Sequence, residues 1–192
     1  GLSDRIEVLA SDYRDLEGTF DRLVSIEMIE AVGHANLPAY FRACADRLRP
    51  DGAMLLQAIT MPDRDYQDYL ASVDYIQRYV FPGSSLPSLG AITRAVARTD
   101  LRVDHVESIG HHYGETLRRW RRAFTARLAE VRALGFDERF VRLWTYYLCY
   151  CEAGFEERYV DDLQIVLARP GWETPPHVPG AIDPRSATRS GS

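Results

Sequence analysis

The sequence contains no lysine, so all 23 of its basic residues are arginine. We interpret this bias as the codon usage of a GC-rich, bacterial genome. Cysteine is scarce as well, because the chain has only Cys44, Cys149 and Cys151, without the spacing of a metal site. Such usage is typical of a reducing, cytoplasmic compartment rather than of a disulfide-stabilised secreted protein. No hydrophobic run approaches the roughly 18 residues that a transmembrane helix needs.

The sequence also lacks an excess of positive charge. Its formal net charge is −5 at pH 7, which argues against a general nucleic-acid-binding protein. The 192 residues are 46% hydrophobic, and this is enough for one domain with a substantial core.

The pattern of apolar residues predicts an α/β fold. Strands are predicted at 5–10, 20–26, 53–59, 101–109 and 162–169. Helices are predicted at 36–49, 90–98, 117–134 and 140–154, and a helical insertion at 63–82. The segment after 170 has four prolines and no apolar periodicity, so we expect a domain over 1–170 and a disordered tail over 171–192.

Polar residues follow several of the predicted strands. Ligands of open α/β sheets bind beyond the carboxyl ends of the strands, which here are residues 12–14, 25–30 and 57–60. Glu27 and Glu30 in "SIEMIEAVG" lie three residues apart, so a helical turn would place them on one face. Two acids in this position indicate either chemistry or only a favourable interaction with a helix dipole.

Three other segments offer weaker signals. The string "GHHYGETLRRW" (110–120) contains candidate acid–base groups, although a structural role is the better interpretation of the pattern alone. The string "RRWRR" (118–122) is either a solvated helix face, which we favour, or a patch for anionic lipid headgroups. Cys149 and Cys151 lie two apart and do not face each other on a helix, so no metal site or disulfide is predicted there.

Six strings, in this order and spacing, are far more specific together than any one of them. They are "DYRDL", "FDRLVSIEMIEAVG", "LLQAIT", "YVFPGSSLPS", "HHYGETLRRW" and "YYLCYCEAGF". From residue 5 to about 170 the chain resembles the cyclopropane-fatty-acyl-phospholipid synthase family, which includes the mycolic acid cyclopropane synthases. Members are class I S-adenosylmethionine-dependent methyltransferases. The resemblance therefore implies a Rossmann-like fold with a helical substrate-binding insertion.

The resemblance also implies an activity and its partners. The reaction is transfer of a methylene or methyl group from S-adenosylmethionine to the cis double bond of an unsaturated fatty acyl phospholipid, which gives a cyclopropane fatty acid. A bicarbonate ion takes the proton, and the enzyme works in the cytoplasm as a homodimer in peripheral contact with the inner face of the membrane. A methyl-branched product, a small-molecule amine substrate and a non-catalytic lipid-binding remnant are the alternatives.

Specific residues match the catalytic strings of the family. Glu30 matches the acid that orients bicarbonate, Tyr147 matches a tyrosine that contacts the ion, and Ile59 matches a backbone contact. Gln57 stands where many relatives carry histidine; glutamine can donate a hydrogen bond but cannot titrate. Glu27 is expected to face solvent or the helix terminus.

Other matches concern the cofactor. Asp12, Tyr13 and Arg14 match the loop that packs on the adenine, and Ser25 and Ile26 match the strand end beside the methionine portion. His112 and Tyr113 fall in a matched string but receive no role.

Parts of the family pattern are not found in these residues. They are the glycine-rich loop that receives the cofactor, the acid that binds the ribose and a cysteine of the bicarbonate site. The sheet order of this fold is 3-2-1-4-5-7-6, and the predicted strands correspond to strands 3 to 7. We therefore expect the chain to be the C-terminal part of such an enzyme, truncated at its N-terminus.

Overall fold

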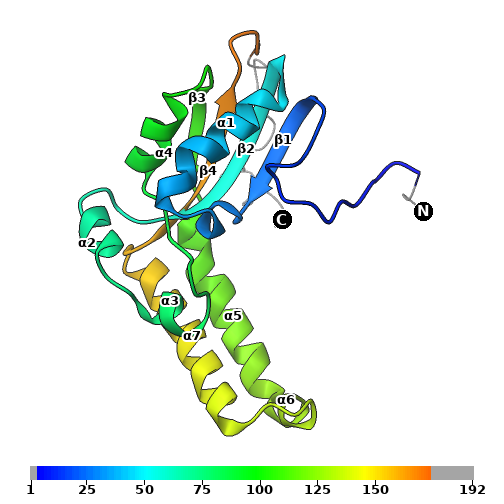
Figure 1. Cartoon of the computed structure of the whole chain (residues 1–192). Helices are drawn as coiled ribbons and strands as arrows, with labels where there is room; N and C mark the ends of the chain where they lie inside the picture. Colours follow the sequence, from blue (N-terminus) through cyan, green and yellow to red (C-terminus); the bar gives the residue numbers. More distant parts are fainter. Residues whose placement is uncertain (1–3, 174–192) are drawn as a thin grey trace, which may run out of the picture.

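The computed structural model describes residues 4–173, which contain one four-stranded sheet with the order β1-β2-β4-β3 (Figure 1). β1 (Phe20–Ile26) is parallel to β2 (Leu48–Thr60). β4 (Asp161–Ala168) is antiparallel to β2 on one side and to β3 (Arg102–Ser108) on the other. This order is the 4-5-7-6 part of the expected sheet, so the predicted α/β fold is confirmed for these four strands.

The helices that cover one face of the sheet come from the connection between β1 and β2 and from the longer connection between β2 and β3. η1 (Ile29–Ala31), η2 (His34–Asn36) and α1 (Leu37–Asp46) link β1 to β2, as the predicted βαβ unit requires. α4 (Leu89–Val96) lies beside α1 on the same face (Figure 1). Because side chains alternate along a strand, one face of β2 and β4 supplies the core. Its buried members are Met54, Leu56, Ala58, Leu163, Ile165 and Leu167, packed with Tyr40, Phe41 and Ile92.

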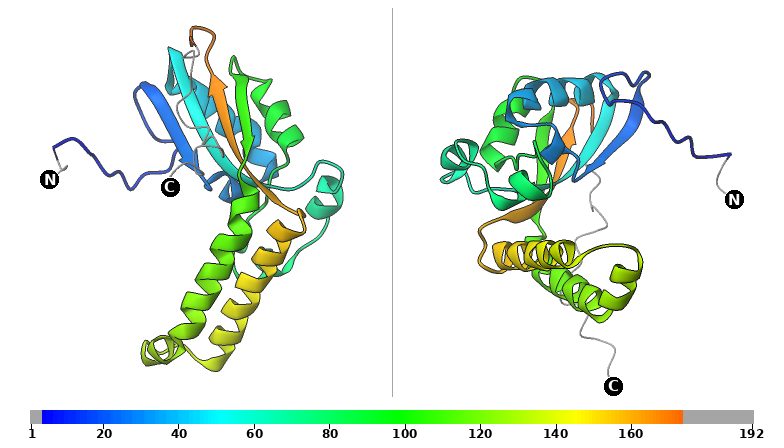
Figure 2. Two further views of the ribbon diagram at one scale, coloured as in Figure 1. Left: turned by 180° about the vertical axis from the view of Figure 1, so that it is seen from behind. Right: turned by 60° about the horizontal axis from the view of Figure 1, so that its bottom comes forward.

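A helical hairpin projects from the sheet between β3 and β4 (Figures 1 and 2). It consists of α5 (Tyr113–Ala126), α6 (Leu128–Ala133) and α7 (Glu138–Glu156), after the short η3 (Gly110–His112). The predicted helix over 117–134 is therefore wrong as one element. Arg127 leaves helical geometry at φ −114° and ψ 23°, and Gly135 at φ +93° then reverses the chain.

The insertion predicted at 63–82 is helical, with α2 (Tyr66–Leu70) and α3 (Tyr75–Tyr79). Asp74 and Gln77 form a capping box that begins α3. Within residues 4–173, none of the helices combines the length and the apolar character that crossing a bilayer requires.

The predicted strand over 5–10 does not form, and this prediction is wrong. A strand needs the N–H and C=O groups of a neighbour, and in the described part of the chain β1 pairs only with β2. Ile6, Val8 and Leu9 are exposed, and Figure 1 shows the segment running away from the sheet. Residues 174–192 lie outside the described residues, so the disordered tail and the domain boundary remain predictions.

The position of β4 between two strands predicts where the fold is most sensitive. Ile165 is fully buried on β4, so Ile165→Ala should lower the free energy of unfolding by about 2–5 kcal/mol through lost burial and a residual cavity. Val24→Ala on β1, where Val24 is 61% exposed, should cost much less. Urea unfolding midpoints measure both. Similar losses for the two variants would contradict this account of the core.

Candidate functional site: a carboxylate cluster around Gln57

Gln57 is the centre of a polar cluster on the face of the sheet opposite α1 and α4. Its Nε2 donates to Glu27 Oε1 at 2.9 Å, to Asp162 Oδ2 at 2.9 Å and to the Tyr113 hydroxyl at 3.1 Å. Its Oε1 accepts from Gln164 Nε2 at 2.9 Å, which fixes the orientation of the amide. Two amide protons are thus shared among three acceptors, so the donor capacity of Gln57 is fully used.

Strand register explains why these side chains meet. In the β2–β4 ladder Gln57 is opposite Gln164 and Ile59 is opposite Asp162, so all four side chains are on one face. Tyr113 begins α5, which follows β3, and its ring stacks on Phe155 of α7 with centroids 4.9 Å apart. The cluster therefore joins the sheet to the base of the hairpin.

Glu27 follows β1 directly and has left-handed backbone geometry, with φ +49°. Such a conformation costs roughly 1–3 kcal/mol for a residue other than glycine and has to be held by its surroundings. The Glu27 N–H donates to the Gln57 carbonyl at 2.9 Å, and the carboxylate accepts from Gln57 and from the Tyr113 hydroxyl. Glu27 is exposed and lies just before η1, in line with the expectation that it faces solvent or the helix terminus. Its carboxylate is in addition held in the cluster, which was not predicted.

Glu30 lies one turn further on, in η1, and is half-buried. Its Oε1 accepts from the Ile59 backbone N–H at 2.7 Å, whereas its Oε2 is buried without a hydrogen-bond partner among the described residues. Burial, together with the nearby charge of Glu27, raises the pKa of the Glu30 carboxyl above its usual value. One oxygen is therefore anchored and the other is free to act.

Asp162 is a site residue that the sequence interpretation missed. It is fully buried, and its Oδ1 has no partner among residues 4–173. Burial, and then the charge of Glu27, raises the pKa of Asp162 from 3.8 to about 7. The only signal in the sequence was the pair of acids at the start of the apolar strand "DDLQIVLA". This pair does not reveal which acid belongs to the cluster: Asp162 does, whereas Asp161 accepts a hydrogen bond from Ser108 Oγ on the neighbouring strand.

Tyr147 lies on α7 beside the cluster but not within hydrogen-bond contact of Glu30. Like Ile59, it packs against the small buried cluster of Leu117, Leu148 and Phe155. Its ring centroid is 4.8 Å from that of Trp144 and 6.2 Å from that of Phe81. Burial and the neighbouring Cys151 raise the pKa of the Tyr147 hydroxyl. Burial also raises the pKa of the Cys151 thiol to about 11. Both groups are therefore uncharged at neutral pH.

The residues expected to contact the cofactor meet at the carboxyl end of β1. The Tyr13 ring contacts Tyr40 edge-on with centroids 5.5 Å apart, and the Tyr40 hydroxyl donates to Ser25 Oγ at 2.7 Å. Arg14 Nη2 and Asp12 Oδ2 are 2.8 Å apart, and hydrogen bonds from Arg14 lower the pKa of Asp12 to about 2. Ile26, the last residue of β1, is exposed beside them.

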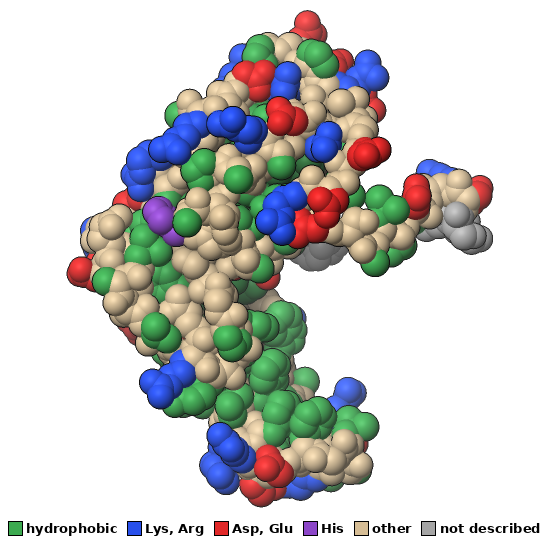
Figure 3. Space-filling model, in the orientation of Figure 1, with side chains coloured by type: hydrophobic (Ala, Val, Ile, Leu, Met, Phe, Trp, Pro, Cys, Tyr) green, Lys and Arg blue, Asp and Glu red, His purple; other side chains and the backbone are tan. Residues whose placement is uncertain are grey.

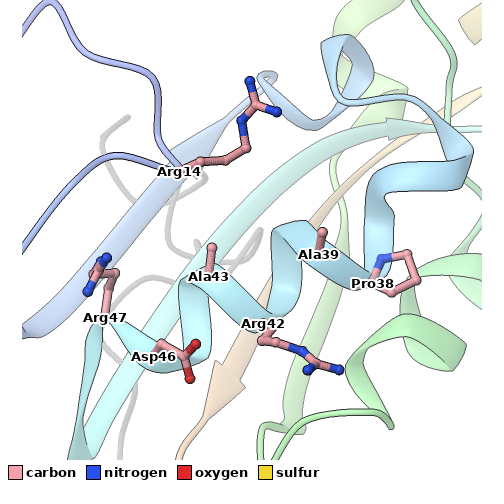
Figure 4. A pocket seen from close by; sticks show the side chains of 7 residues that line it. All are labelled: Arg14, Pro38, Ala39, Arg42, Ala43, Asp46 and Arg47. Atoms are coloured by element: carbon pink, nitrogen blue, oxygen red, sulfur yellow. The ribbon is translucent and has the colours of Figure 1, made fainter.

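Two cavities among the described residues lie apart from Glu27, Glu30 and Gln57. One of about 490 Å³ lies along the outer side of α1, between the loop that carries Arg14 and the side chains of Arg42 and Arg47 (Figure 4). Another, of about 660 Å³, is lined by Asp161 and Leu163, which flank Asp162 on the other face of β4. Glu27, Glu30 and Gln57 line neither of these two cavities.

Comparisons with known proteins identify relatives of this chain. Residues 1–165 match the family model described as mycolic acid cyclopropane synthetase. Tuberculostearic acid methyltransferase of Mycobacterium tuberculosis is 45% identical over 172 residues, which are 89% of this chain and 40% of that protein. Cyclopropane-fatty-acyl-phospholipid synthase of Escherichia coli (strain K12) is 35% identical over 165 residues, 85% of this chain and 41% of that protein.

A solved structure agrees with these matches. The cyclopropane synthase MmaA2 from Mycobacterium tuberculosis superposes with a TM-score of 0.76 and 26% identity, over 86% of this chain and 63% of that one. The chain thus spans about two fifths of the length of the two curated relatives and less than two thirds of the solved one.

The raised pKa of Asp162 predicts a pH dependence of stability. Asp162 stays protonated in the folded state up to about pH 7 but ionises near 3.8 when unfolded, so stability falls as pH rises through this window. Asp162→Asn removes this loss. The difference in free energy of unfolding, variant minus wild type, should therefore increase by up to about 4 kcal/mol between about pH 4 and about pH 8. Urea unfolding measures the difference, and one that does not vary with pH would contradict the prediction.

Proposed function

The chain belongs to the mycolic acid cyclopropane synthetase family of S-adenosylmethionine-dependent, lipid-modifying methyltransferases, and we propose that it carries the acid cluster and the acyl-chain side of such an enzyme. The proposed reaction transfers a methyl carbon from S-adenosylmethionine to the cis double bond of an unsaturated fatty acyl phospholipid and closes a cyclopropane ring. The observation that supports this best is the convergence of Glu27, Glu30 and Asp162 beside apolar, aromatic helices.

The chemistry calls for negative charge in an apolar setting. The alkene electrons form a bond to the methyl carbon, the carbon–sulfur bond breaks, and S-adenosylhomocysteine leaves. Positive charge passes from the sulfonium to the other alkene carbon. Loss of a proton from the transferred methyl group then supplies the electrons that close the ring. Carboxylates fixed in advance near this position stabilise the cation, and more strongly where water is excluded.

Within this scheme Glu30 is the proposed proton acceptor. Its raised pKa makes it a stronger base than an ordinary carboxylate, and its Oε2 is not committed to a donor among the described residues. Gln57 is a positioning residue, since its amide holds Glu27 and Asp162. Ile59 supports Glu30 through its backbone N–H, and Tyr147 contributes to the apolar wall. The protonated Cys151 offers no thiolate that would trap the cation.

A bicarbonate ion is the proton acceptor that the family resemblance implies. The donors expected to hold it are engaged, because the Ile59 N–H donates to Glu30 and the Gln57 amide donates to two other carboxylates. These residues in this arrangement do not fit bicarbonate, so we assign the proton to the chain's own carboxylate.

The cofactor side of the proposal uses the carboxyl end of β1. Tyr13 and Arg14 are candidates to contact the adenine, and Ser25 and Ile26 to border the methionine portion, with Asp12 holding Arg14 in place. The link from Tyr13 through Tyr40 to Ser25 supports a common site for these residues. The whole enzyme's affinity for S-adenosylmethionine depends on groups beyond them.

A methyl-branched acyl product is the second candidate. One relative, 45% identical, is named a tuberculostearic acid methyltransferase, and the non-titrating Gln57 replaces the histidine that the cyclopropane-forming pattern carries. Mass spectrometry of the methylated lipid distinguishes a ring from a branch.

Glu30→Gln tests the proposal. In the complete enzyme, turnover on a cis-unsaturated phospholipid in the presence of S-adenosylmethionine should fall roughly a hundredfold or more, because the amide cannot accept the proton. The KM for S-adenosylmethionine should change little, since Glu30 acts on the acyl side. Glu157→Gln, an exposed acid beyond α7, is the matched control. Unchanged turnover in Glu30→Gln would remove this residue from the mechanism.

Gln57 gives a separate test of the positioning role. Gln57→His should keep most of the activity because imidazole can still donate to a carboxylate. Gln57→Leu should lose about 1–3 kcal/mol of stabilisation, since it leaves Glu27 and Asp162 without this donor. Steady-state kinetics and thermal unfolding would be compared for the two variants. Equal activity of both would show that the amide does not organise the cluster.

A further inference from the structure

The far end of the helical hairpin, here called the hairpin tip (residues 119–142), exposes large apolar side chains. Leu134 is 77% exposed, Trp120 55% and Phe136 45%. Gly135 makes the turn that presents Leu134 and Phe136 between α6 and α7. The tip lies away from the sheet (Figures 1 and 2), so the described fold does not cover these groups. Clustered exposed residues of this size mark an interaction surface.

The same segment has a charge opposite to that of the whole chain. The hairpin tip contains seven arginines and three acidic residues, a net charge of +4, whereas the chain has −5. Arg122, Arg127 and Arg139 are exposed, and none of them forms an ion pair within residues 4–173. Figure 3 shows hydrophobic side chains gathered over the hairpin, with charged ones at its far end. Basic side chains around an apolar centre are the composition of a surface that enters an anionic lipid interface.

A row of aromatic rings connects the hairpin tip to the carboxylate cluster. Successive centroid distances are 4.2 Å for Phe136–Phe140, 5.8 Å for Phe140–Trp144 and 4.8 Å for Trp144–Tyr147. Phe140, Trp144 and Tyr147 recur at four- and three-residue spacing, so they follow one face of α7, and Phe136 extends the row just before the helix begins. Tyr147 and Ile59 both pack against the buried side chains of Leu117, Leu148 and Phe155. The Ile59 backbone N–H in turn donates to Glu30. From Phe140 to Tyr147 the row covers roughly 10 Å of helix.

We propose that the hairpin tip inserts into the surface of an anionic phospholipid bilayer, and that the aromatic row guides an acyl chain from that surface to the Glu30–Gln57 site. This rests on the proposed function, because it presumes a lipid substrate. A second copy of the chain is a poorer occupant, since a symmetric contact between two tips would bring together like charges of +4 each.

Vesicle flotation with the whole chain, without S-adenosylmethionine, tests the surface. The wild type should partition roughly tenfold more strongly onto phosphatidylglycerol than onto phosphatidylcholine vesicles. Leu134→Asp should weaken binding to phosphatidylglycerol roughly tenfold or more. Val8→Asp makes the same change at a residue that is 89% exposed on the N-terminal segment, and should bind like the wild type.

Arg122→Glu on α5 and Arg98→Glu after α4 form a second matched pair, both at exposed arginines, and only the first should lose binding. Circular dichroism checks that each variant is folded. If Leu134→Asp does not fold, the comparison of Arg122→Glu with Arg98→Glu tests the proposal in its place. Equal binding by tip and control variants, or equal binding to both lipids, would overturn the proposal. The proposal would also be overturned if the wild type did not bind vesicles and sedimentation showed that Leu134→Asp dissociates an oligomer.

Methyl transfer separates this proposal from the proposed function. The same unsaturated phospholipid would be presented in vesicles and in detergent micelles. Leu134→Asp should lose activity on vesicles and keep it on micelles, because only the first requires the surface. The assay uses the complete enzyme that contains this chain. If its wild-type form methylates neither presentation, the proposed function fails, and the flotation result alone decides the role of the hairpin tip. Equal loss on both presentations would place Leu134 in the reaction itself and overturn the docking role.

Discussion

The Gln57 amide is the contact on which the arrangement of the site depends. It donates to carboxylates that come from the end of β1 and the start of β4, and it contacts the tyrosine that starts α5. Two like charges 4 Å apart repel by roughly 4 kcal/mol at an effective dielectric of 20, so these acids need a shared donor to lie together. Gln164 holds the amide from behind. The base of the hairpin is thereby fixed to the sheet at its most polar point.

This arrangement sacrifices stability for chemistry. Glu27 has a left-handed backbone, Asp162 is buried with one oxygen unpartnered among the described residues, and Glu30 is desolvated on one side. Each feature is unfavourable for folding alone, and such conflicts concentrate where proteins bind or react. Together they hold negative charge in readiness for a cation, with no reorganisation needed when the cation forms.

Local patterns in the sequence predicted the paired strands and the helices that pack on them, because alternation and helical spacing reflect which face is buried. They failed at residues 5–10, where the described structure offers no neighbouring strand for the strand-like pattern to pair with. They also failed at Arg127, where the predicted helix is interrupted without a proline or glycine in the sequence. The family resemblance named Glu30 and Ile59, which the structure brings into contact. The link between Gln57 and Asp162 joins residues 105 positions apart, so no local pattern encodes it.

The sheet order has a consequence for how the chain folds during synthesis. Among residues 4–173 β3 pairs only with β4, yet the whole hairpin separates the two strands in sequence. During synthesis the backbone N–H and C=O groups of β3 therefore stay hydrated and unpaired while more than fifty further residues leave the ribosome. At translation rates of roughly 5–20 residues per second this delay lasts seconds. β4 then pairs with β2 and β3 in one late step, so the core closes and the carboxylate cluster forms almost simultaneously. A ribosome stalled before residue 168 would carry helices and an unfinished sheet, which makes this segment a natural point for chaperone engagement.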